Sequence, residues 1–263
     1  MIKFFRQIRQ DLLMKNKIGK YFKYAIGEIV LVVIGILIAV QINNWNEEKL
    51  RVKNEYEIIT NLAEDFKSNL SNLENSIDSI YPKLTARLQN TTTCFGKKDN
   101  QLTDADKRAI RNTGFRLTEI IDGSLNSILN SDKLELLRDP KLKNMITAYP
   151  AKIESFKKAE NNLEHSVLDV LRDVFRHYVS LADRYNDDDP IKQNVVKSDY
   201  AGLVNNLYYQ NIIFGQLITV DALTNRAKDL KLATEEIYNQ IIKNMQQNTN
   251  HAISNSESNS LDL

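Results

Sequence analysis

One stripe of side chains in the second half of the chain has the residue types and the spacing to bind a metal ion. Its four members follow one another at intervals of four residues: His165, Asp169, Asp173 and His177. Side chains four positions apart share one face of an α-helix, so neighbouring pairs could bind zinc or another divalent cation. Arg172 and Arg176 lie among them, and their cations would pair with the carboxylates and repel a metal. We therefore expect a solvated helix face with ordinary salt bridges, and no metal site.

The other residues whose side chains could take part in chemistry indicate neither a catalytic site nor a cofactor site. The chain has no phosphate-binding glycine-rich loop, no His-Glu-x-x-His motif, no nucleophile elbow and no EF-hand loop. The carboxylates Asp187 to Asp189 suit a solvated loop better than a cation site. The aromatic group of Tyr208, Tyr209 and Phe214 is more typical of a helical core than of a ligand cage. We expect a protein that is not an enzyme.

Cys94 is the only cysteine, which excludes an intrachain disulfide and a cysteine-rich metal site. A lone thiol could link two chains in an oxidising compartment. We expect instead an ordinary surface or semi-buried side chain.

An apolar stretch near the amino terminus predicts a transmembrane helix over residues 25–45. From Ala25 to Ile42 the chain reads AIGEIVLVVIGILIAVQI, about 27 Å of helix against a hydrocarbon core of about 30 Å. Tyr21, Tyr24 and Trp45 fall at the two boundaries, where amphipathic rings anchor a span. A buried core helix and a cleaved signal peptide are the alternatives. The flanking cations argue against the first, and the lack of a small-x-small cleavage pattern argues against the second.

The distribution of charge predicts the orientation of this anchor. Residues 1–24 contain seven basic residues and one acidic residue, whereas the rest of the chain is mildly acidic and has no basic stripe for nucleic acid. Positively charged segments are retained in the cytoplasm, so the amino terminus should be inside and the large domain outside. The segment 1–24 is either an amphipathic helix on anionic lipid or a disordered basic tail.

Three residues of the span could have a role beyond anchoring. Glu28 is an acid near the cytoplasmic end, where it is either solvated at the interface or functional. Gly35 and Ala39 form a small-xxx-small patch that suits close packing of two helices. Dimerisation through this patch is a hypothesis.

The sequence pattern of the soluble part, residues 46–245, indicates helices. Together with the span it predicts an all-α fold: a single transmembrane helix followed by an extramembrane antiparallel helical bundle. Apolar residues recur at steps of three and four, as in Leu62, Phe66, Leu70, Leu73, Ile77, Ile80, Leu84 and Leu88. Pro82 should kink this helix, and Thr103 and Asp139 should begin others. Several short helices should fill 103–149, and two long ones should lie beyond Pro150 and from about Asp199 to Met245. The polar tail 246–263 should be disordered.

The segment AIGEIVLVVIGILIAVQINNWNEEK, Ala25 to Lys49, resembles the signature of an uncharacterised bacterial family of single-pass proteins with a domain of unknown function. The resemblance covers roughly residues 1–50, with weaker similarity through Ser124 to Ile146. It implies a bacterial cell envelope, which makes the outside predicted from the charge distribution a periplasm. Together the two expectations place the span in the inner membrane, the amino terminus in the cytoplasm and the large domain in the periplasm. The resemblance implies no activity.

We expect a membrane-tethered helical module that acts by binding, either another envelope protein or a copy of itself. The alternative is a sensor whose bundle binds a small ligand and shifts the span. Its inner segment is too short for a folded signalling domain, so it would need a membrane partner. An envelope hydrolase is the third class.

Overall fold

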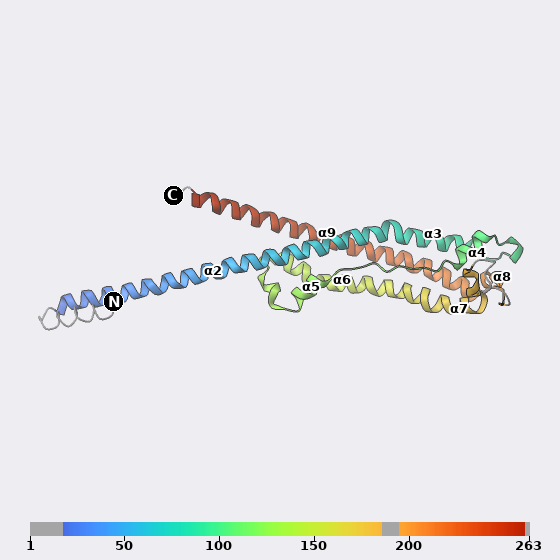
Figure 1. The fold of residues 1–263 in the computed structure, drawn as a ribbon, viewed down its shortest axis with the longest axis horizontal. Helices are drawn as coiled ribbons and strands as arrows, with labels where there is room; N and C mark the ends of the chain where they lie inside the picture. Colours follow the sequence, from blue (N-terminus) through green and yellow to red (C-terminus); the bar gives the residue numbers. More distant parts are fainter. Residues whose placement is uncertain (1–17, 186–194, 261–263) are drawn as a thin grey trace. The chain divides into compact units, whose positions relative to one another are not determined.

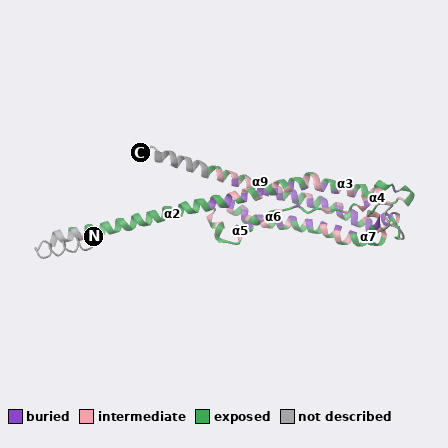
Figure 2. Cartoon of the chain, viewed as in Figure 1, coloured by how far each residue is buried: buried purple, intermediate pink, exposed green. Residues whose placement is uncertain are grey.

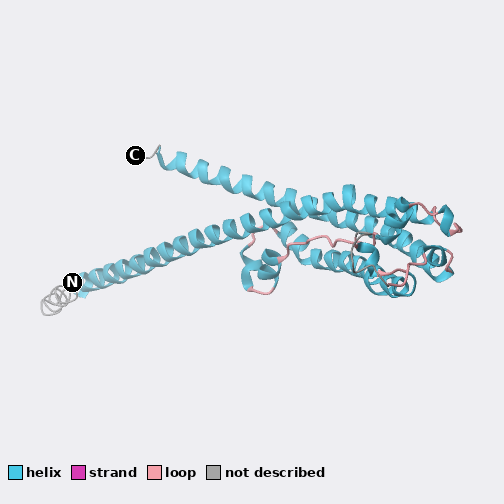
Figure 3. Ribbon diagram, turned by 45° about the vertical axis from the view of Figure 1, so that its right-hand side comes forward, coloured by secondary structure: helices cyan, strands magenta, loops and turns pink. Residues whose placement is uncertain are grey.

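The structure, a computed structural model, describes residues 18–185 and 195–260, and all regular elements among them are helices (Figure 3). The chain divides into two compact units, Met1–Glu57 and Ile58–Leu263. The all-α class predicted from the sequence is therefore confirmed for the described residues.

Helix α2 (Ile18–Asn75) contains the whole predicted transmembrane stretch. It is the one helix among the described residues that is long and apolar enough to cross a membrane, and none of its most apolar stretch is buried. Figure 2 shows this part of α2 exposed on all sides. Because an apolar helix that no protein covers suits lipid as its solvent, α2 has the properties of a membrane span.

The second unit is a helical bundle built from three passes of helix and one extended return (Figure 1). The first pass is the end of α2, a π-turn η1 (Ser76–Ile80) and α3 (Tyr81–Thr92), followed by η2 (Asp99–Gln101) and α4 (Asp104–Arg111). Residues 112–122 then run back without regular structure to α5 (Gly123–Leu129) and η3 (Asp132–Leu136).

The second pass is α6 (Pro140–His165), a π-turn η4 (Ser166–Leu171) and α7 (Arg172–Tyr178). Two short helices follow it, η5 (Leu181–Arg184) and α8 (Tyr200–Val204). The third pass is α9 (Leu207–Ser260). Helix α9 packs against both α3 and α6. It runs antiparallel to both, whereas α3 and α6 run in the same direction because the extended segment returns the chain between them (Figure 1). The antiparallel packing expected from the sequence is therefore found between α9 and its neighbours α3 and α6, and not between α3 and α6.

The buried positions of the first pass follow the predicted three-and-four spacing as far as η1. They include Leu62, Phe66, Asn69, Leu73 and Ser76, and then Tyr81, Leu84 and Leu88. The step of five residues across the π-turn corresponds to its one extra residue. As a result, Ser76 and Tyr81 are in the core, while the predicted Ile77 and Ile80 are only partly buried.

The signals for helix ends are confirmed at two places and wrong at one. Thr103 caps α4 in a reciprocal box with Asp106, and Asp139 caps α6, whose first residue is Pro140. Pro150 lies inside α6 and does not separate two helices. A proline inside a helix removes one backbone donor and crowds the carbonyl four residues earlier, and the buried residues of α6 on both sides of Pro150 outweigh that cost.

The third pass also differs from the prediction at both of its ends. Asn205 caps the short helix α8, so the long helix begins at Leu207 and not near Asp199. At the other end α9 continues to Ser260, through most of the predicted disordered tail. That tail contains no Gly or Pro to interrupt helical hydrogen bonding.

Candidate functional site

An extended segment, residues 112–122, runs along the bundle with its backbone held by polar side chains (Figure 1). Neither a helix nor a sheet satisfies its peptide groups, so other donors and acceptors must do so. Many of these come from a cluster that we call the polar seam, and all its members are buried: Asn69, Ser76, Tyr81, Thr118 and Glu160. The seam joins α2, η1, α3 and α6 to the extended segment.

Asn69 pairs with the backbone of Ile121 as the edge of a neighbouring β-strand would. Its Nδ2 donates to the Ile121 carbonyl at 2.7 Å, and the Ile121 N–H donates to Asn69 Oδ1 at 2.7 Å. Close by on α2, Asn72 donates to the carbonyl of Glu119 at 3.0 Å. Two asparagines therefore fix the register of the extended segment against α2.

Glu160 holds the middle of the same segment from a core position of α6. Its Oε1 accepts the Thr118 N–H at 2.7 Å and the Tyr81 hydroxyl at 3.3 Å. The Thr118 hydroxyl in turn is hydrogen-bonded to Ser76 at 2.8 Å and to Tyr81 at 2.9 Å. Burial raises the pKa of the Glu160 carboxyl, against the lowering effect of the hydrogen bonds from Thr118 and Tyr81. Burial likewise raises the pKa of Tyr81.

The seam is closed to solvent, because Tyr81 is 1% exposed and Glu160 is 3% exposed. Its groups cannot touch a dissolved substrate, so the arrangement positions a segment and does not perform catalysis. The sequence-based prediction missed it because only apolar residues were used to trace the core. Asn69 and Ser76 continue the three-and-four spacing of their apolar neighbours, and this spacing was the available signal.

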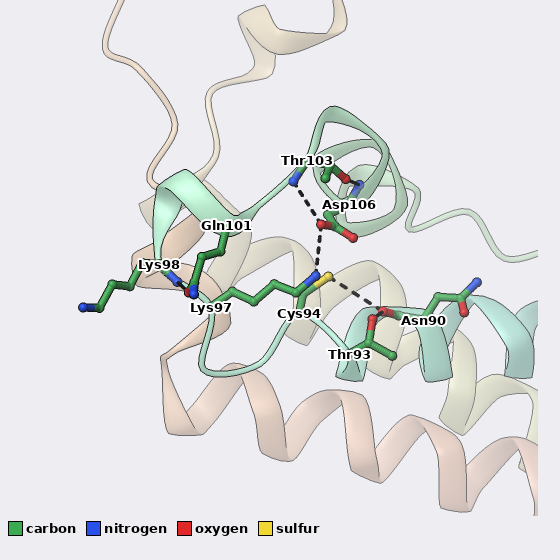
Figure 4. A network of polar contacts seen from close by, with 8 residues as sticks. All are labelled: Asn90, Thr93, Cys94, Lys97, Lys98, Gln101, Thr103 and Asp106. Atoms are coloured by element: carbon green, nitrogen blue, oxygen red, sulfur yellow. Dashed lines mark hydrogen bonds and ion pairs between the residues drawn. The ribbon is translucent and has the colours of Figure 1, made fainter.

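The loop between α3 and α4 closes around Cys94 (Figure 4). The thiol is fully buried and donates to the Asn90 carbonyl, with 3.7 Å between Sγ and the oxygen. Burial, and then the nearby Asp106 carboxylate, raise the pKa of this thiol. The expectation of a surface or semi-buried cysteine is therefore wrong. Cys94 is a protonated core residue that cannot reach a second chain.

Asp106 organises the same loop through its carboxylate (Figure 4). Oδ2 accepts the Thr103 N–H at 3.0 Å and forms an ion pair with Lys97 at 3.1 Å. The bond from the Thr103 backbone, and then the one from Lys97, lower the pKa of Asp106 to about 2. The Asp106 carboxylate therefore stabilises the conformation of this loop.

A cavity of about 360 Å³ lies where α4 ends beside α7. Three arginines line it: Arg111 is the last residue of α4, and Arg172 and Arg176 lie one turn apart on α7. Thr113 and Ser180 add hydroxyl groups, and no carboxylate is among the described residues that line it. This cavity can hold a negatively charged molecule. The sequence-based prediction treated two of these arginines only as neighbours of the histidine stripe.

The π-turn η4 interrupts the predicted metal stripe. His165 Nδ1 lies 2.6 Å from Asp169 Oδ2, and both side chains are largely exposed. Asp173 and His177 lie beyond η4 on α7, and the wider π-turn rotates them relative to an unbroken α-helix. Within the described ranges, no group of three or more His, Cys, Asp and Glu side chains is arranged to hold a metal ion. The four residues therefore lie on three successive helical segments, α6, η4 and α7.

The predicted aromatic group is split between the core and the surface. Tyr209 is 1% exposed and packs edge-on against Phe95 and Phe175, with ring centroids 6.1 and 6.0 Å away. Tyr208 and Phe214 are 59% and 49% exposed. Only Tyr209 is therefore a core residue, and Asp187 to Asp189 lie outside the described residues.

The residues singled out in the span all lie on α2. Trp45 is exposed, with Lys49 Nζ 5.5 Å from its ring centroid. Gly35 and Ala39 leave an open surface, since a Cβ placed on Gly35 would meet nothing within 4 Å. Glu28 is half-buried. The side chains of Tyr21 and Tyr24, like residues 1–17, fall outside the part that is described.

Comparison with known proteins connects the chain to one family. Residues 28–149 match the model of a family of unknown function, DUF6090. No curated protein and no solved structure matches the chain. The matched range begins at Glu28 and includes most of the polar seam, but not Glu160, Arg172 or Arg176. The resemblance carried by the span is thus confirmed, and residues 28–149 are similar to this family of unknown function.

Proposed function

We propose that this chain is a membrane-anchored helical module of a bacterial envelope that acts by binding, and that its partner is a second copy of the same chain. The proposal places α2 in the inner membrane, the basic amino terminus in the cytoplasm and the bundle in the periplasm. The uncovered apolar part of α2 supports the anchor, and the seven cations before it support the orientation.

The observation that carries the binding role is a second apolar face on α9. Leu207, Phe214 and Ile218 are 70%, 49% and 72% exposed, and their spacing of seven and four residues places them on one line of the helix. The opposite face of α9 already fills the core through residues such as Val220 and Leu223. A helix in water does not need two apolar faces, so the outer one is suited to a partner.

A second copy is the partner that best fits the rest of the chain. The open patch of Gly35 and Ala39 in the span suits close approach of an identical helix. Two copies anchored in one membrane also meet at high effective concentration, which strengthens a weak contact. The apolar row on α9, defined as Leu207, Phe214 and Ile218, then needs to contribute only modest affinity.

Disulfide crosslinking in native membranes tests this contact. Because Cys94 is buried, Ile218→Cys places the one accessible thiol in the apolar row, and the matched control Lys152→Cys places it on the exposed polar face of α6. We expect oxidation to give a covalent dimer with Ile218→Cys and monomer with Lys152→Cys. Equal crosslinking at both positions, monomer in both, or a disulfide to a different protein would refute self-association.

The anchor and its orientation are tested separately. The full chain should stay with membranes after an alkaline carbonate wash, and a tag after Leu263 should be accessible from the periplasm. Release by carbonate, or a tag accessible only from the cytoplasm, would contradict the membrane assignment.

A ligand-binding ectodomain is the second candidate function, and the arginine-lined cavity between α4 and α7 favours it. Such a sensor would need a membrane partner for its output. Both candidates are binding roles, and they use different residues of the bundle.

A further inference from the structure

We infer that the cavity lined by Arg111, Arg172 and Arg176 is a binding site for a small organic anion, a carboxylate or phosphate carried on an apolar body. This inference deepens the second candidate function, ligand binding by the bundle, and does not require self-association. It rests on the charge, the hydrogen-bonding groups and the wall of the cavity.

Three arginines concentrate positive charge on the described lining of the cavity. Arg172 and Arg176 lie four residues apart on α7, where two like charges repel, and Arg111 approaches them from the end of α4. Within the described part of the chain, Arg172 and Arg176 have no ion pair or hydrogen bond. A second cavity of about 410 Å³ shares Arg111 and Arg172 and adds Arg108. An anion bound here would relieve the repulsion of several cations at once.

The nearby acid, Asp183, is already engaged. Its Oδ2 accepts hydrogen bonds from the Tyr200 hydroxyl at 2.6 Å and from the Ser198 hydroxyl at 2.8 Å. Its backbone carbonyl accepts a hydrogen bond from Arg111 Nη1. This bond fixes the guanidinium of Arg111 at the cavity, while further donors on its fork stay available for an oxyanion.

The remaining wall defines the rest of the ligand. Phe175, Val179 and Leu181 are apolar, and Thr113 and Ser180 carry hydroxyls. A bare inorganic anion would leave this apolar wall uncovered, whereas an aromatic or aliphatic carboxylate or phosphate would contact it. A volume of about 360 Å³ suits a molecule of that size.

Calorimetric titration of the full chain in a non-ionic detergent tests the site. Phenyl phosphate and phenylacetate serve as probes, and benzyl alcohol is the uncharged analogue. We expect at least one of the two anions to bind stoichiometrically, with affinity that falls as salt is added, and benzyl alcohol not to bind. Because neither partner nor membrane is needed, failure here would leave the proposed self-association intact.

The variant Arg172→Gln/Arg176→Gln removes two exposed cations from the cavity without removing a hydrogen bond that holds the fold. The matched control Lys152→Gln/Lys228→Gln removes two exposed cations from α6 and α9. Binding should weaken at least tenfold in the first variant and less than twofold in the second. Protection of Cys94 from thiol reagents reports that both variants are folded. Absence of binding in the unmodified chain, or equal weakening in the two variants, would overturn the site.

Discussion

Replacing Asn69 with alanine should release the extended segment from α2. Asn69 is 1% exposed and makes both hydrogen bonds to the peptide groups of Ile121, so the substitution leaves one N–H and one carbonyl without their partner. An unsatisfied buried group costs about 1–3 kcal/mol. Because Ile121 itself is 37% exposed, water replaces part of the lost hydrogen bonding. We therefore expect the substitution to lower the free energy of unfolding by about 2–3 kcal/mol in total.

Asn72→Ala is the matched control on the same helix. It removes one hydrogen bond, from an exposed amide to the Glu119 carbonyl, and should cost only about 0.5–1 kcal/mol. The two changes delete the same atoms from neighbouring positions, so a difference between them reports the hydrogen-bonding environment and not the loss of volume.

Hydrogen exchange followed by mass spectrometry measures the effect where it occurs, on peptides that span residues 112–122. A cost of about 2–3 kcal/mol corresponds to roughly 30- to 150-fold faster exchange in Asn69→Ala, since about 1.4 kcal/mol is a factor of ten. Peptides from the middle of α6 should change far less. If Asn69→Ala accelerates exchange no more than Asn72→Ala does, Asn69 does not hold the segment.

Three further predictions concern the seam and the Cys94 loop. Glu160→Gln keeps an oxygen acceptor for the Thr118 N–H and cannot ionise. Because the folded pKa of Glu160 is raised above the ordinary value of 4.5, the unmodified protein should lose stability as pH rises from 4.5 through the folded pKa, and denaturation of Glu160→Gln should show a smaller loss. Cys94 should resist maleimide in the folded chain and react at once in denaturant, and rapid labelling of the folded chain would contradict its burial. Gly96→Ala should destabilise by about 1 kcal/mol in thermal unfolding because Gly96 has φ of 79°, whereas Gly123→Ala, without a positive φ, should not be destabilised by backbone strain.

The sequence by itself determined the helical class, the apolar span and the signals at Thr103 and Asp139, because each depends on local properties. Helical periodicity, lipid-compatible length and capping groups involve residues within a few positions of one another. The family resemblance around Glu28 to Trp45 was equally accessible, since it is carried by one continuous segment.

Tertiary structure decided what the polar residues do. Asn69, Ser76 and Glu160 have the composition of a helix surface, and they are buried because a non-helical segment brings peptide groups that need hydrogen bonds. Arg111 and Arg172 are far apart in the sequence and meet only because that segment lets α6 run in the same direction as α3. Contacts between residues so far apart in the sequence depend on the path of the chain, and the spacing of neighbouring residues does not predict that path.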